Sequence, residues 1–188
     1  MVVSLVAMIS IAIFGVFQSG VSVLELVATP SPDEDVQIFF EKFSRDLQNT
    51  FRYTGIYFHG EEEKVQFPTV ISTRPELGGD QGIGRVTYSY DSNERAIARL
   101  AENVSDIYEG KKSKGKPVAI LHSVHSLKFE YFEYDPAQKQ FGWIEDWTDE
   151  GDKKTNLLAV KLEMELDDEG GSRTITRTIA TPIGGQPR

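Results

Sequence analysis

The sequence predicts an α+β protein in which a long N-terminal helix, apolar in its first half and amphipathic in its second, packs on antiparallel β-sheet. Three observations predict this class. The first 30 residues are apolar and carry a single charge, Glu25. A stretch with helical spacing of apolar residues follows them, and the rest of the chain mostly alternates apolar and polar residues, as strands do. With 188 residues, the chain has the length of one domain with an appendage.

The apolar leader has the composition of a membrane helix. Residues 1–17 contain no charged side chain. A helix over residues 2–17 spans about 24 Å, and its continuation to Leu24 reaches the thickness of a hydrocarbon core, roughly 30 Å. We therefore expect residues 1–29 to form a membrane anchor. The apolar side chains of this anchor include Leu5, Ile9, Ile13, Phe14 and Phe17.

Two other interpretations of the leader stay open. A cleaved signal peptide has basic residues before its apolar stretch and small residues at its cleavage site, and neither pattern is clear in this sequence. A buried core helix is the second alternative. Seventeen successive apolar or small residues exceed what a domain of this size usually buries, so the membrane helix is favoured.

An amphipathic helix is expected from about Pro32 to Arg52. Ser31 suits the N-cap position, Pro32 the first helical position, and Glu34 completes a capping box. Apolar residues then recur at steps of four, three, four and four, which places on one stripe Val36, Phe40, Phe43, Leu47 and Phe51. The opposite side is expected to carry Glu41, Lys42, Arg45, Asp46 and Gln48. Packing of the apolar stripe on a sheet is favoured, and a partner's groove is the alternative.

About eight strands, joined mostly by hairpins, are expected after the helix. The clearest lies at residues 158–166, where five apolar residues alternate strictly with polar or small ones. The others are expected at residues 56–58, 65–71, 85–90, 95–100, 118–121 continuing into 127–131, 141–143, and 173–180. Loops are expected at residues 76–84, 101–116 and 145–154. The α+β body therefore extends from residue 30 to 182, and residues 183–188 form a flexible tail.

Composition excludes several kinds of function. A net charge of −9 opposes binding to nucleic acid through a basic surface, and the absence of cysteine removes disulfides, thiol nucleophiles and Cys-ligated zinc. His122 and His125 point to opposite faces of a strand, which disfavours a shared metal ion. The acidic stretch at residues 145–152 lacks the spacing of a calcium loop, so a solvated charge run is favoured over an ion site. We expect no catalytic residues, no cofactor, no metal and no small-molecule substrate.

Three segments resemble the J-class minor pseudopilins of type II secretion, which belong to the type IV pilin-like superfamily. They are Gly84-Arg85-Val86-Thr87-Tyr88-Ser89-Tyr90, Val124 to Phe132, and the paired strands Ala159 to Leu166 and Arg173 to Pro182. The apolar leader, amphipathic helix and sheet together are similar to the pilin-like plan. The resemblance covers nearly the whole chain.

The resemblance implies a non-enzymatic subunit in the pseudopilus tip complex that primes assembly. Its implied partners are the minor pseudopilins of the H, I and K classes, and its implied location is the bacterial inner membrane, crossed once, with the body in the periplasm. Val2-Val3-Ser4-Leu5 is similar to the stretch that follows the prepilin peptidase motif. We therefore expect that motif, the methylated N-terminus and the basic leader upstream of Met1.

Three alternatives to this function remain. A minor pilin of a type IV pilus belongs to the same class. A secreted, β-rich ligand-binding protein would use the leader as a signal peptide. An acidic hydrolase is the third, although no spacing of carboxylates marks out an acid and a base.

Overall fold

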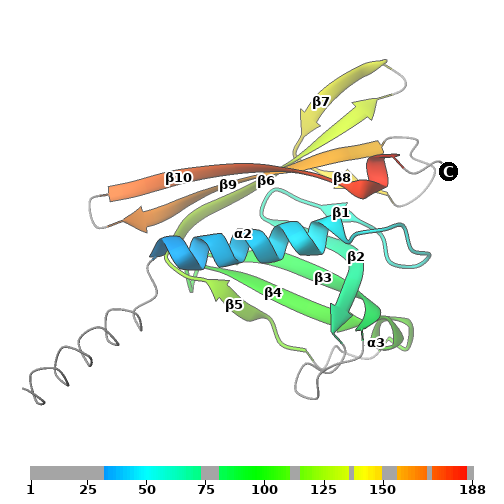
Figure 1. Ribbon diagram of the computed structural model, residues 1–188, viewed down its shortest axis with the longest axis horizontal. Coiled ribbons are helices and arrows are strands. Elements are labelled where there is room, and N and C mark those ends of the chain that lie inside the picture. The colour runs from blue at the N-terminus through cyan, green and yellow to red at the C-terminus, as the bar shows by residue number, and fades with distance from the viewer. Residues whose placement is uncertain are drawn as a thin grey trace, which may run out of the picture. The chain divides into compact units, whose positions relative to one another are not determined.

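Two antiparallel β-sheets dominate the structure, a computed structural model that describes residues 32–72, 81–110, 115–135, 138–149, 156–168 and 171–185 (Figure 1). The six-stranded sheet has the order β5-β4-β3-β2-β1-β8, and the four-stranded sheet has the order β10-β9-β6-β7. The strands are β1 (His59–Gly60), β2 (Lys64–Ser72), β3 (Gln81–Asp91), β4 (Ala96–Asn103), β5 (Val118–Leu121), β6 (Val124–Asp135), β7 (Gln140–Ile144), β8 (Trp147–Thr148), β9 (Asn156–Asp168) and β10 (Gly171–Ala180). The helices are α2 (Pro32–Gln48), the short α3 (Val104–Tyr108) and the 3-10 helix η2 (Pro182–Gly185).

The predicted fold class is wrong. The described chain is mostly β-sheet, no long apolar helix occurs in it, and the long N-terminal helix of a pilin-like fold is not seen. Helix α2 has 17 residues and ends at Gln48 rather than near Arg52. Just after the helix, the Thr50 hydroxyl donates a hydrogen bond to the Pro68 carbonyl of β2, 2.8 Å away. The aromatic and β-branched residues that follow favour extended backbone over helix.

The membrane-anchor residues Leu5, Ile9, Ile13, Phe14 and Phe17 lie outside the described residues. No helix in the described part of the chain is long and apolar enough to span a bilayer. Contacts divide the chain into two compact units, residues 1–38 and residues 39–188. Everything that follows about packing concerns the second unit.

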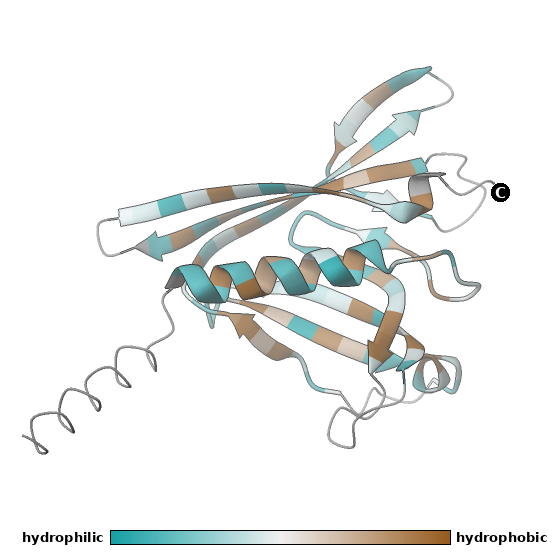
Figure 2. Cartoon of the chain, in the orientation of Figure 1, coloured by the Kyte–Doolittle hydropathy of each residue, from teal (hydrophilic) through white to brown (hydrophobic). Residues whose placement is uncertain are grey.

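The core of this unit lies between the two sheets, with the part of α2 from Phe39 onward inserted between them (Figure 1). Phe43 is fully buried and contacts both layers. Its ring lies 5.0 Å from the ring of Tyr88 in β3 and 5.8 Å from that of Phe129 in β6, measured between centroids. Figure 2 shows apolar and polar residues alternating along the strands, as expected when one face of each sheet is buried.

Beyond the end of α2, the sheets meet directly through a second aromatic cluster. Phe58 stacks on Phe67 of β2 and makes edge-to-face contacts with Tyr131 of β6 and Trp147 of β8. Gly60 of β1 lies against the Tyr131 ring so closely that a side-chain carbon could not be added there. The Tyr131 hydroxyl donates to the Glu61 carbonyl, 2.9 Å away, which ties β6 to the β1–β2 turn.

The residues predicted on the apolar stripe of the helix fall in two groups. Val36, Phe40, Phe43 and Leu47 lie in α2 and are buried, whereas Phe51 follows the helix and is half-buried. Phe39 is also buried, so the apolar face of α2 is wider than the predicted stripe.

The prediction that Asp46 lies on the exposed side of the helix is wrong, because it is 6% exposed. Its Oδ2 accepts hydrogen bonds from the Tyr88 hydroxyl at 2.7 Å and from Arg99 Nε at 2.8 Å. These two donors explain how a carboxylate can remain in the core.

Candidate functional site

A cluster of aromatic side chains covers the end of the four-stranded sheet, on the face that points away from the core. Strand β7 pairs with the last part of β6, and this hairpin extends clear of the rest of the body (Figure 1). Phe132 lies directly opposite Trp143, and Tyr134 directly opposite Phe141. Since residues two apart share a face of a strand, all four side chains lie on one face. We call Phe132, Tyr134, Phe141 and Trp143 the hairpin cluster.

The rings of the hairpin cluster contact one another in sequence. The Phe132 ring centroid lies 4.9 Å from that of Trp143 and 5.9 Å from that of Phe141, and Tyr134 lies 4.9 Å from Phe141. Phe141 nevertheless remains 61% exposed and Trp143 40% exposed. Single exposed apolar residues are ordinary on a protein surface, but a contiguous exposed aromatic group is typical of a site that another molecule covers.

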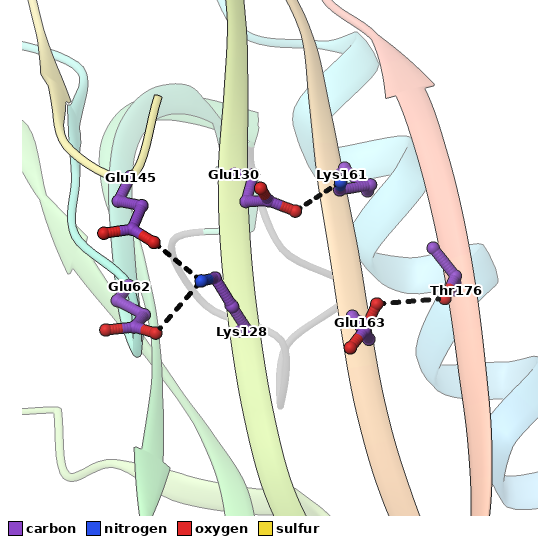
Figure 3. A network of polar contacts seen from close by, with 7 residues as sticks. All are labelled: Glu62, Lys128, Glu130, Glu145, Lys161, Glu163 and Thr176. Atoms are coloured by element: carbon purple, nitrogen blue, oxygen red, sulfur yellow. Dashed lines mark hydrogen bonds and ion pairs between the residues drawn. The ribbon is translucent and has the colours of Figure 1, made fainter. Parts of the chain in front are cut away.

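A strip of charged side chains lies next to the hairpin cluster, and Lys161 links the two by its contact with Trp143. Figure 3 shows the charged side chains of this strip. Lys161 of β9 places its Nζ 4.7 Å from the centre of the Trp143 ring and forms an ion pair with Glu130 of β6. Further along the face, Lys128 Nζ lies 2.7 Å from Glu145 and 3.4 Å from Glu62. The hydrogen bond from Lys128 lowers the pKa of Glu145, and the same bond raises the pKa of Lys128.

The strip continues to the opposite edge of the sheet with smaller polar groups. The Thr176 hydroxyl of β10 lies 3.5 Å from Glu163 of β9 (Figure 3). Exposed pairs of this kind contribute little stability. The outer face is therefore aromatic at the β7 end and polar elsewhere, which is the arrangement of an apolar contact region with a polar rim.

Strand β7 is also an edge strand. Within the described residues it pairs with β6 alone, which leaves the backbone N–H and C=O groups along its other side without a strand partner. Gly142, at its centre, has no atom within 4 Å of the position where a side-chain carbon would lie. Such an edge can accept a strand from a second protein by backbone hydrogen bonding.

The other candidates from the sequence are not brought together. His125 lies on β6 and contacts Arg95 at 3.1 Å, while His122 lies exposed before that strand. In the acidic stretch, Glu145 binds Lys128, and Asp149 accepts a hydrogen bond from the Phe58 backbone N–H. No group of three or more potential metal ligands occurs in the ranges that the structure describes.

Sequence reasoning placed Phe141 and Trp143 on a strand without identifying the hairpin cluster. Their period-two spacing puts them on one face, and the Asp135-Pro136 turn before them predicts the hairpin with β6. The missing information was which face of the hairpin is left uncovered, and this depends on how far the hairpin extends beyond the core.

No protein-family model and no curated protein matches this sequence.

Proposed function

We propose that this chain is a minor pseudopilin of the J class, a non-enzymatic subunit of the tip complex of a type II secretion pseudopilus. In this proposal the leader anchors the chain in the bacterial inner membrane, and the β-rich body lies in the periplasm. The body contributes lateral contacts to minor pseudopilins of the H, I and K classes. The proposal rests on the resembling segments and on a surface suited to assembly.

The hairpin cluster carries this proposal. Aromatic residues are enriched at the centres of protein interfaces, where a few of them dominate the binding energy. The exposed parts of Phe141 and Trp143 amount to roughly 200 Å² of apolar surface, given full side-chain areas of 150–250 Å². Covering this surface would contribute up to about 5 kcal/mol at roughly 25 cal/mol per Å².

The segments that resemble J-class proteins form strands of both sheets. Gly84 to Tyr90 lies in β3, at the centre of the six-stranded sheet, and Tyr88 and Val86 are fully buried. Val124 to Phe132 forms most of β6, the strand that bears half of the hairpin cluster. The remaining segment forms β9 and β10, which complete the four-stranded sheet.

A secretion assay tests the proposal. In a strain that lacks the wild-type gene, the double variant Phe141→Ala/Trp143→Ala should abolish secretion of type II substrates at normal protein levels. Losing two interface aromatics weakens binding by at least about 2 kcal/mol, or roughly 30-fold. Tyr57→Ala removes an aromatic residue that is 41% exposed outside the cluster, and it should leave secretion unchanged. Wild-type secretion by the double variant would contradict the role of the cluster.

A further inference from the structure

A second feature, which shares no residue with the hairpin cluster, is an open cavity beside α2. It has a volume of about 630 Å³ and lies between the C-terminal half of α2 and strands β2, β3 and β4. Its lining includes Lys42, Arg45 and Asn49 from the helix, Gln81 from β3 and Arg99 from β4. Small-molecule sites typically have volumes of about 300–1,000 Å³.

The charge of this cavity is opposite to that of the whole chain. Three cationic side chains line it, Lys42, Arg45 and Arg99, together with one carboxylate, Asp46. The lining therefore carries a net charge of +2 in a chain whose net charge is −9. Within the described ranges Arg99 is paired with Asp46, and neither Lys42 nor Arg45 forms an ion pair.

The cationic groups are close enough to affect one another. Burial lowers the pKa of Lys42, and the guanidinium groups of Arg99 and Arg45 lower it further. Like charges held together in this way repel, and an anion between them would relieve the repulsion. Asp46 offsets part of this repulsion, and the lining still carries more positive than negative charge, which an added anion would balance.

Arg99 is fixed in the orientation that such a site needs. Its Nε donates to Asp46 Oδ2 at 2.8 Å, and its side chain is only 17% exposed. A guanidinium has five N–H donors, so Arg99 can bind an oxyanion at the cavity while Nε remains on Asp46. Asn49, Gln81 and Ser72 add neutral donors around the same space.

We propose that this cavity binds a small, multiply charged oxyanion, one that carries phosphate or carboxylate groups, between Lys42, Arg45 and Arg99. Its volume exceeds that of a bare phosphate and suits a phosphorylated or polycarboxylate small molecule. The site is separate from the hairpin cluster, so it does not depend on the secretion role proposed above.

Titrations of the full chain, purified with a mild detergent, test the proposal. Inorganic phosphate and citrate are added separately up to about 10 mM, each against potassium chloride at equal ionic strength, because surface electrostatics alone respond to salt. Amide NMR signals of α2 and β4 should shift in a saturable manner with at least one of the two anions. Saturation by phosphate alone or by citrate alone identifies the preferred group.

Two matched double variants locate the site. Lys42→Met/Arg45→Gln removes two cavity cations and leaves the Asp46–Arg99 pair intact, and it should weaken anion binding about tenfold or more. Lys116→Gln/Lys139→Gln removes two exposed cations outside the cavity and should retain the wild-type affinity. The proposal is overturned if neither anion gives a saturable response beyond that of potassium chloride. It is equally overturned if both double variants bind alike.

Discussion

Two glycine substitutions test the packing of the sheets, because the same added methyl group meets opposite surroundings. At Gly60 in β1, a side-chain carbon would lie 2.1–2.5 Å from three atoms of the Tyr131 phenol. Ordinary contacts between such atoms are about 3.5–4.0 Å. At Gly142 in β7, no atom lies within 4 Å of the corresponding position.

The Tyr131 ring has no room to move aside. It is fully buried, its hydroxyl donates to the Glu61 carbonyl, and its ring lies nearly perpendicular to that of Phe58, with the centroids 6.2 Å apart. Overpacking at such a site costs about 3 kcal/mol. Gly60→Ala should therefore lower the melting temperature by roughly 6–12 °C, since 1 kcal/mol corresponds to about 2–4 °C for a protein of this size. Gly142→Ala should raise the free energy of unfolding by about 0.5–1 kcal/mol, because alanine loses less backbone entropy than glycine when it enters a strand.

Thermal unfolding followed by circular dichroism, on both variants and the wild type in the same detergent, measures these shifts. The melting temperature should fall in Gly60→Ala and rise in Gly142→Ala. Equal shifts, or a melting temperature of Gly60→Ala within about 2 °C of the wild type, would mean that β1 and β6 do not pack as described.

Two further predictions concern the core. Phe43→Ala should lower the free energy of unfolding by about 3–5 kcal/mol, measured by urea unfolding, because Phe43 is fully buried. Phe141→Ala, at an exposed position, should change it by less than about 0.5 kcal/mol. Similar losses in the two variants would show that Phe43 does not bridge the sheets. Burial raises the pKa of Tyr88 and of Tyr131 well above the ordinary value near 10, and the charge of Asp46 adds to this at Tyr88. Because the unfolded chain then releases protons that the folded chain keeps, stability should fall as pH rises above about 10. Absorbance titration should show two tyrosines that ionise only on unfolding, and early ionisation of every tyrosine would contradict the burial.

Local patterns in the sequence located much of the secondary structure. The strict alternation at residues 158–166 lies within β9, and the predicted return strand at 173–180 lies within β10. Strand β9 has one face in the core, with Val160, Leu162 and Met164 fully buried, which is the condition under which period two appears in a sequence. Strand β10 is mostly exposed and buries only Ile179. The 101–116 segment was expected to be a loop, but it contains the end of β4 and the short helix α3, which has no side-chain cap at its start.

What the sequence could not show depends on contacts between distant residues. Asp46 is charged, yet it follows Phe43 by three positions and so shares its face. Its burial depends on Tyr88 and Arg99, which are 42 and 53 residues away. The need for glycine at position 60 likewise depends on Tyr131, and the cavity beside α2 exists only once the helix lies on strands β2 to β4. The predicted fold class failed for a different reason: the described residues are mostly β-strand, and the longest helix among them, α2, has 17 residues.

We propose that the body binds another minor pseudopilin through the hairpin cluster. Light scattering of a mixture of the two proteins measures this binding. The chain is mixed with the I-class pseudopilin encoded in the same genome, each at about 100 µM, because a contact between bodies without a shared bilayer is expected to be weak. We expect a mass equal to the sum of the two proteins for the wild type and for Tyr57→Ala, and two separate masses for Phe141→Ala/Trp143→Ala. Two separate monomers at this concentration, or a complex that the double variant leaves intact, would contradict it.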